Sequence, residues 1–257
     1  MSTSVDHAHP AESESGGEPA DAGAPHPLDN PVWAALSGAH ARFAEVRGRA
    51  ARYPAEMSPF AAVADQADPA AWHDLAGLIG PGGTALVTGS PVPPAGWDVV
   101  EGGEGVQMVG TALRAEHDPE AVRLGPGDVP DILDLIARTR PGPFRTRTVE
   151  FGSYLGIREN GRLIAMAGER LRPPGWTEIS AVCTDPDHRG RGLASRLVRA
   201  VAAVIEERGD TPLLHAAGNN TNALRLYEAM GFTRRRHPQF LLVRAPKTDA
   251  QGRPDPA

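Results

Sequence analysis

The connection TDPDHRGRGLAS over residues 184–195 constrains this chain of 257 residues more than any other segment. It joins a predicted strand over 178–184 to a predicted long helix over roughly 191–208, whose apolar residues recur at helical spacing. Gly190 and Gly192 let a ligand approach the backbone closely. No Ser, Thr, Asp or Asn stands immediately before the helix, so its first amides lack a side-chain cap. Uncapped amides at the positive end of a helix dipole form an anion site suited to a pyrophosphate.

Positive charge in this chain comes almost entirely from arginine, because Lys247 is its single lysine. Schiff-base chemistry, pyridoxal phosphate chemistry and a Walker phosphate loop all need a positioned lysine, and all three are therefore excluded. Arg189, Arg191 and Arg196 add positive charge around the predicted anion site. The alternative interpretation is a flexible connection whose arginines are solvated.

The formal net charge of −6 is divided unevenly along the chain. Residues 1–30 carry −6, residues 31–118 carry −5, and residues 119–245 carry +5. A mildly basic segment inside an acidic protein favours a small polyanionic ligand over nucleic acid. We therefore expect no nucleic-acid partner.

The two ends of the chain are predicted to be disordered. Residues 1–30 and 246–257 hold almost no large apolar side chains, so they cannot offset the entropy of ordering. The N-terminus has neither the basic region nor the apolar region of a signal peptide, and no apolar stretch approaches the roughly 20 residues that span a bilayer. We expect a cytoplasmic protein without membrane contact. Cys183 is the one cysteine, which excludes an intrachain disulfide and a Cys-rich metal site; we expect a buried structural thiol and no metal.

Residues 31–118 are predicted to form a small α/β unit without a chemical motif. Helices are predicted to begin at Asn30-Pro31 and Asp68-Pro69, where an N-cap residue precedes a proline. The glycine clusters 80–83 and 102–105 are interpreted as turns, because neither precedes a helix that could cradle phosphate. Predicted strands cover 60–64, 84–88 and 106–109.

From residue 119 to residue 245 the pattern predicts a second unit in the order β-α-β-β-β-α-β-α-β. The Asn160-Gly161 pair is a strong hairpin signal between two of its strands. Arg234-Arg235-Arg236 is interpreted as a solvated turn before the last strand. The predicted fold class is α/β (α+β): a mixed, mostly antiparallel sheet flanked by helices, preceded by the smaller α/β unit.

A second informative stretch is NTNALRLYEAMGF over residues 220–232. Asn220 and Tyr227 stand seven residues apart, so they share one face of the predicted helix over 221–230. The plain alternatives are that Asn220 is an N-cap and that Tyr227 is a half-buried packing residue. Taken alone, the stretch favours these alternatives.

Together the two stretches resemble the GNAT superfamily of N-acetyltransferases. Arg189-x-x-Gly192-x-Ala194 is similar to its pyrophosphate-binding signature, and residues 220–232 are similar to its late helix and turn. The resemblance covers about 119–245. It implies acetyl-CoA as co-substrate, with the backbone of Val182 and Thr184 bonding the pantetheine arm at a splayed, bulged strand, and with Asn220 near the cofactor arm. The residues that it places at the pyrophosphate are Arg189, Gly190, Arg191, Gly192, Ala194 and Ser195.

The chemistry of amide formation adds two catalytic candidates. A thiolate leaving group must gain a proton, and a tyrosine with its ordinary pKa of about 10 is protonated at neutral pH and can supply it. Tyr227 is therefore predicted to be the general acid, as the resemblance also implies. Glu178 lies where several relatives place a general base. With a pKa of about 4.3 it would need a raised pKa or a water relay, and a solvated strand-end carboxylate is the alternative.

The predicted function is transfer of an acetyl group from acetyl-CoA to a primary amine by direct attack in a ternary complex. The alternative is an acyl-CoA-binding sensor or regulatory module without transferase activity. We expect a small-molecule or peptide amine as acceptor and a monomer or homodimer. The acceptor pocket is expected near Phe144, Glu150, Phe151 and Tyr154. The N-terminal unit is expected to wall that pocket or to cover the catalytic sheet, and it is small enough to be a degenerate copy of the same fold.

Overall fold

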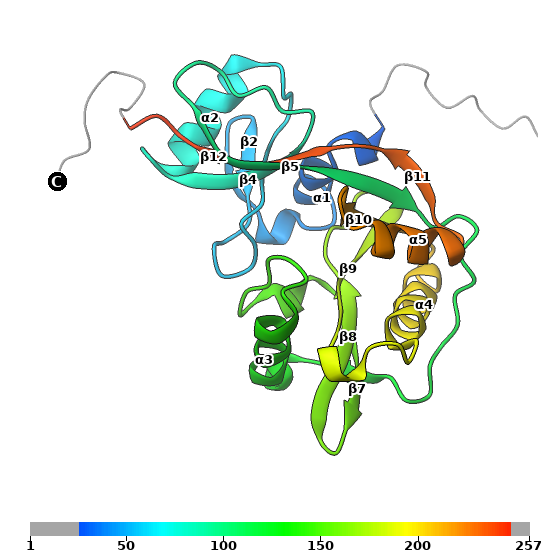
Figure 1. Cartoon of the computed structure of the whole chain (residues 1–257). Helices are drawn as coiled ribbons and strands as arrows, with labels where there is room; N and C mark the ends of the chain where they lie inside the picture. The colour runs from blue at the N-terminus through cyan, green and yellow to red at the C-terminus, as the bar shows by residue number, and fades with distance from the viewer. Residues whose placement is uncertain (1–25, 248–257) are drawn as a thin grey trace, which may run out of the picture.

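A mixed sheet of nine strands carries the fold, and Figure 1 shows it running from the N-terminal half into the C-terminal half. The computed structural model describes residues 26–247. The strands of this sheet are β4 (Thr84–Gly89), β5 (Asp98–Val109), β6 (Val122–Leu124), β7 (Tyr154–Glu159), β8 (Arg162–Glu169), β9 (Trp176–Thr184), β10 (Thr211–Ala217), β11 (Thr233–Arg236) and β12 (Gln239–Arg244). Their order is β4-β12-β5-β10-β9-β8-β7-β6, and β11 also pairs with β5. Only β9 and β10 run parallel to each other, so the predicted mixed, mostly antiparallel sheet is confirmed.

Helices cover both faces of the β7–β10 part of this sheet (Figure 1). On one face lie α4 (Leu193–Glu206) and α5 (Thr221–Ala229); on the other lies α3 (Val129–Thr139). Leu197, Val201 and Ile205 of α4 are fully buried, as the four-residue spacing of its apolar stripe predicts. No helix within residues 26–247 is both long enough and apolar enough to cross a membrane.

The N-terminal half adds a small three-stranded sheet and two helices. The strands are β1 (Glu45–Arg47), β2 (Ala50–Arg52) and β3 (Ala61–Val63), and the helices are α1 (Pro31–Leu36) and α2 (Pro69–Ile79). The carboxylate of Asp68 caps α2 by accepting a hydrogen bond from the Ala70 amide at 2.9 Å, as the sequence predicts. Asn30 does not cap α1, because its side-chain amide donates instead to the carbonyl of Val63 at 2.8 Å.

The large sheet crosses the predicted division between residues 118 and 119. β5 pairs with β10 along Gly105–Val109, and β4 pairs with β12 over its whole length. The N-terminal half therefore supplies two strands that lie in register with strands of the C-terminal half. The extent of each domain stays a prediction, whereas the shared sheet fixes how the two halves sit against each other.

Part of the predicted N-terminal tail is ordered, and that prediction was wrong for residues 26–30. A short helix, η1 (Pro27–Asp29), places Leu28 entirely inside the protein. Asp29 pairs with Arg235 at 2.7 Å and with Arg236 at 2.8 Å. Burial of one leucine and two ion pairs therefore hold this segment on the sheet. Residues 1–25 and 248–257, also predicted to be disordered, lie outside the described residues.

Two segments that were interpreted as turns are strands. Gly102–Gly105 lie inside β5, where an added Cβ at Gly105 would stand 2.5 Å from Cε2 of Phe240. Gly102 and Gly105 accept the close approach of the Leu241 and Phe240 side chains of β12. Arg234–Arg236 lie in β11, where Arg234 is opposite Met108 of β5. Local sequence could not show either pairing, because both depend on partners more than a hundred residues away.

Candidate active site

The two parallel strands separate part-way along, and a cavity opens between them. β9 and β10 are paired from Trp176 and Thr211 to Ile179 and Leu214, and no further. Beyond that point lies a cavity of about 690 Å³, bordered by the ends of β9 and β10, the loop before α4, and α5. The predicted site residues that line it are Val182, Thr184, Arg189, Gly190, Arg191, Gly192, Ala194, Ser195, Asn220 and Tyr227. Glu178 is the predicted site residue that does not line it.

A bulge frees part of the β9 backbone at this cavity. The β8–β9 register runs from Met166 opposite Cys183 to Gly168 opposite Ser180, so two β9 residues face the single Ala167. Ala181 adopts a left-handed backbone with φ of 53°, which a residue other than glycine rarely does. The strand is therefore both splayed from β10 and bulged from β8 at the position where the resemblance expects a bulge.

The start of α4 presents uncapped amides to the same cavity. Its N-cap residue is Gly192, which has φ of 73° and no side chain to accept a hydrogen bond. Gly190 also lies in the left-handed region, with φ of 77°, and an added Cβ at either glycine would meet no atom within 4 Å. The first residues of this 14-residue helix, Leu193, Ala194 and Ser195, line the cavity, and no side chain caps their amides.

The arginines around this loop differ in whether a nearby carboxylate neutralises their charge. Arg196 is held by Asp118 at 2.6 Å and also pairs with Glu120, so the expectation that it adds positive charge to the anion site was wrong. Arg191 is paired with Glu159 at 3.0 Å. Arg189 forms no ion pair within residues 26–247, and its Nε donates only to the carbonyl of Thr184 at 3.4 Å.

Asn220 and Tyr227 lie on the side of the cavity formed by α5. The side-chain oxygen of Asn220 caps the helix by accepting from the Ala223 amide at 3.2 Å, so the plain interpretation of Asn220 holds while the residue also borders the cavity. The Tyr227 hydroxyl has no hydrogen-bond partner among the described residues. Burial raises its pKa to about 12, which keeps the hydroxyl protonated at neutral pH.

Glu178 is fully buried in an ion pair with Arg170. Nε and Nη2 of Arg170 donate to its two carboxylate oxygens at 2.8 and 2.5 Å, and Nδ1 of His215 lies 2.7 Å from Oε1. Burial is the largest influence on this carboxyl and would raise its pKa, but the charges and hydrogen bonds of Arg170 and His215 together outweigh it and lower the pKa to about 2. The predicted role of Glu178 as a general base does not fit a carboxylate that is fully engaged and weakly basic.

A chain of hydrogen bonds orients the ring of His215. Arg235 donates to Oε1 of Gln107 at 2.8 Å, which leaves the Gln107 amide nitrogen to donate to the carbonyl of Leu28 and toward Nε2 of His215 at 3.1 Å. Nε2 of His215 therefore faces the Gln107 amide, and Nδ1 donates its proton to Glu178. Both ring nitrogens of His215 are thus within hydrogen-bond distance of a partner.

A second cavity of about 490 Å³ adjoins the first. The residues that border both are Pro141, Gly142, Arg170, His215, Ala216 and Ala217. Its outer part is formed by the N-terminal half, through Pro59, Phe60, Leu86 and the stretch from Glu101 to Gly105. None of the residues around which the acceptor pocket was expected lines either cavity: Phe144, Phe151 and Tyr154 are core residues, and Glu150 is paired with Arg147.

Sequence reasoning does not predict Arg170 or His215. One signal was available for the arginine, because Glu178 stands in a strand of otherwise small and apolar residues and a buried carboxylate requires a cation. Arg170 and Arg172, at and just after the end of the preceding predicted strand, were the nearest candidates in sequence. Nothing local marks His215, since its role depends on where β10 meets β9.

Comparisons with known proteins agree with this geometry. Residues 154–241 match the family described as FR47-like protein. N-alpha-acetyltransferase RimI of Mycobacterium tuberculosis is 37% identical over 84 residues, which are 32% of this chain and 52% of that protein. Mycothiol acetyltransferase of Thermobispora bispora is 45% identical over 58 residues, which are 22% of this chain and 20% of that protein. The chain thus spans about half the length, or less, of these curated relatives.

One solved structure matches almost the whole chain. It comes from Novosphingobium aromaticivorans and is described as an acetyltransferase of the GNAT family. It is 39% identical to this chain, with a TM-score of 0.79, and the match covers 87% of this chain and 100% of that one. The resemblance inferred from the two sequence stretches is confirmed: the chain belongs to the GNAT family of acetyltransferases.

Proposed function

We propose that this chain transfers an acetyl group from acetyl-CoA to a primary amine by direct attack in a ternary complex. The observation that carries the proposal is the convergence of the uncapped start of α4, the bulged end of β9 and the Tyr227 hydroxyl on one cavity. An anion site, a row of free backbone groups and a proton donor are the three features that an acyl-CoA substrate and its leaving thiol require.

The lining residues fit the polyanionic part of coenzyme A. Amides of Gly190, Gly192 and the first turn of α4 would hold the pyrophosphate, assisted by the guanidinium of Arg189, which no carboxylate within residues 26–247 pairs. Backbone groups of Val182 and Thr184, with Asn220 opposite, would hold the pantetheine arm. Acetyl-CoA supplies the acyl group as an activated thioester.

The proton for the leaving group is assigned to Tyr227. In the reaction a nitrogen–carbon bond forms, the carbon–sulfur bond breaks, and the sulfur takes the proton of the Tyr227 hydroxyl. With its pKa raised to about 12 by burial, this hydroxyl holds its proton throughout the physiological range. The tyrosinate that is left then takes a proton from solvent, into which the acceptor nitrogen releases one, so the overall transfer balances.

Glu178 and His215 are assigned a positioning role. Glu178 is hydrogen-bonded to His215 and paired with Arg170, and these contacts hold in place the two side chains that border both cavities. Since neither residue has a free basic atom, the acceptor must enter as the unprotonated amine, and its proton is released to solvent.

A thiol-release assay with acetyl-CoA and a panel of amines tests the proposal. Replacing the proton donor, Tyr227→Phe, should lower kcat by about 100-fold, within the usual range for loss of a general acid, and leave the affinity for coenzyme A unchanged in calorimetry. Unchanged turnover would remove Tyr227 from this role. Tight binding of coenzyme A without turnover on any amine would instead support the sensor alternative, which the names of the relatives do not favour. The cytoplasmic location and the monomeric or homodimeric state stay predictions.

A further inference from the structure

We propose that the second cavity is the acceptor site and that it selects a primary amine joined by an apolar segment to a second cationic group, which Glu101 binds. The inference rests on the proposed acetyl transfer, because it names the class of amine that the transferase accepts. Binding of such an amine can be tested separately, since the cavity and its carboxylate exist whether or not transfer occurs.

The two cavities are continuous where the reaction would take place. Arg170, His215, Ala216 and Ala217 border both of them. A molecule in the second cavity can therefore place one end beside the β9–β10 separation while its remainder lies along the β5–β12–β4 part of the sheet. The remaining wall is the Pro141–Pro143 segment that follows α3.

The walls of the second cavity are mainly apolar. Leu86 of β4 is opposite Leu242 of β12, which is opposite Glu101 of β5, so the three side chains stand in one row on one face. The next row on that face holds Phe240 opposite Gly103. Phe60 packs against Phe240 with ring centroids 6.3 Å apart. An acceptor that carries charge along its whole length would lose hydration here without compensation.

Gly103 creates room on this face. An added Cβ at Gly103 would meet no atom within 4 Å, although the residue lies in the middle of a strand and opposite a phenylalanine. By contrast, an added Cβ at Gly105 on the same face would collide with the Phe240 ring. The absence of a side chain at Gly103 thus hollows the sheet surface beside Phe240.

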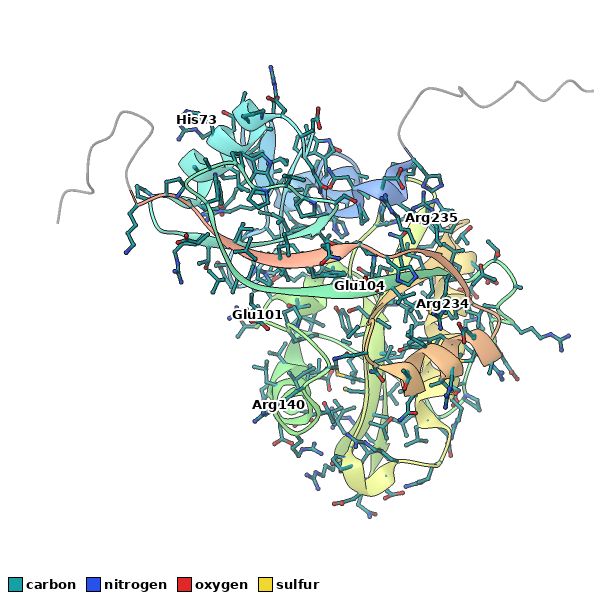
Figure 2. All side chains as sticks on the ribbon, turned by 45° about the horizontal axis from the view of Figure 1, so that its top comes forward. His73, Glu101, Glu104, Arg140, Arg234 and Arg235 are labelled. Atoms are coloured by element: carbon teal, nitrogen blue, oxygen red, sulfur yellow. The ribbon has the colours of Figure 1, made fainter. Side chains whose placement is uncertain are left out.

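Glu101 supplies a negative charge at the outer end of the cavity. Figure 2 shows it on β5, on the side of the sheet that faces Arg140 and α3. Within residues 26–247 its carboxylate forms no ion pair, whereas the carboxylate of Glu104, three residues along the strand, accepts a hydrogen bond from Nδ1 of His237 at 3.0 Å. Glu101 is therefore the acidic group of this cavity that is available to a ligand.

The strand register sets the length of the acceptor. Ala217, at the inner end, is paired with Gly105, and Glu101 lies four residues further along β5. Four residues of extended strand span about 13 Å, and the Glu101 side chain covers several ångströms of that distance. The two nitrogen atoms of the acceptor should therefore lie about 8–10 Å apart, a separation that a six-carbon chain provides.

Three straight-chain amines with six carbons each, which differ in the group at the far end, test the selection: hexylamine, hexamethylenediamine and 6-aminohexanoate. For the full chain, kcat/KM for the diamine, divided by two for its two equivalent ends, should be about fivefold above kcat/KM for hexylamine. The value for 6-aminohexanoate should be below that for hexylamine. Glu101→Gln should bring the diamine to the level of hexylamine. Asp98→Asn is the matched control, because it removes one negative charge from the same strand at a position outside both cavities, and the preference for the diamine should persist.

A cavity-filling pair tests the location independently. Gly103→Val should raise KM for every amine at least tenfold and leave coenzyme A affinity unchanged, while Gly125→Val, at an extended glycine with open space around it and outside both cavities, should change neither. Calorimetry of the diamine with the wild-type chain gives a readout without turnover. If the wild-type chain binds the diamine without acetylating it, and Gly103→Val abolishes that binding, the proposed transferase activity is refuted while the assignment of the cavity stands. Equal kcat/KM for the three amines, or turnover unchanged in Glu101→Gln and Gly103→Val, would overturn the inference and leave the transferase standing.

Discussion

Replacing Glu178 by glutamine should destabilise the fold strongly, because the substitution leaves a buried guanidinium without its counter-charge. In the native protein Arg170 donates two hydrogen bonds to this carboxylate and has 14% of its side chain exposed, while Glu178 has none. A glutamine can still accept from one nitrogen of Arg170 and from His215. It cannot neutralise the charge, and removal of one partner of a buried pair is costly for that reason.

Two routes give a similar magnitude for this loss. A carboxyl that titrates near its ordinary value of 4.5 in the unfolded chain and near 2 in the fold contributes about 3 kcal/mol at neutral pH. Breaking a buried ion pair on one side typically costs about 3–5 kcal/mol. Because the folded pKa is the lower one, the contribution is complete above pH 4.5 and is lost as the pH falls toward 2.

Urea unfolding at pH 7 measures the effect directly. We expect Glu178→Gln to lose about 3 kcal/mol, or roughly 6–12 °C in Tm for a chain of this size, and to lose less relative to wild type near pH 3. The double variant Glu178→Gln with Arg170→Met should recover part of the loss, because no charge is then left unpaired. Glu228→Gln, which breaks an exposed pair with Arg234, is the control and should cost less than about 1 kcal/mol. A loss below about 1 kcal/mol for Glu178→Gln, or strict additivity in the double variant, would refute the argument.

Three further results are expected. Gly192→Ala should lower the free energy of unfolding by about 1 kcal/mol in urea titration and weaken coenzyme A binding in calorimetry, because φ of 73° strains any residue with a Cβ; unchanged affinity would speak against the α4 anion site. The Cys183 thiol is buried and its pKa is raised to about 11 by that burial, so iodoacetamide should label it only after denaturation, and rapid labelling of the native protein would contradict its burial. Finally, kcat/KM should rise about tenfold per pH unit below the pKa of the acceptor amine and show no fall from Tyr227 below about pH 11, whereas a plateau near pH 7 would indicate a side-chain base.

The parts of the site that the sequence predicts are those encoded over short distances. The absence of a capping residue before Leu193, the small residues in the loop and the seven-residue spacing of Asn220 and Tyr227 are all local, and the structure places these residues around one cavity. The position of Glu178 was also predicted, but not its environment. That environment consists of burial, the ion pair with Arg170 and the hydrogen bond to His215, which come from different parts of the sheet. Together they lower the pKa of the candidate base to about 2.

What the sequence by itself determines here is the family, the order of elements and the loop that can hold an anion, since periodicity and capping act within a few residues of each other. Only the tertiary structure decides which part of the chain forms the proposed acceptor site. Glu101 and Gly103 belong to a stretch that local sequence presents as a glycine-rich turn, yet it is a strand between β12 and β10. Strand pairing is a contact between segments distant along the chain, and it alone brings the N-terminal half to the cavity where the transfer is proposed to take place.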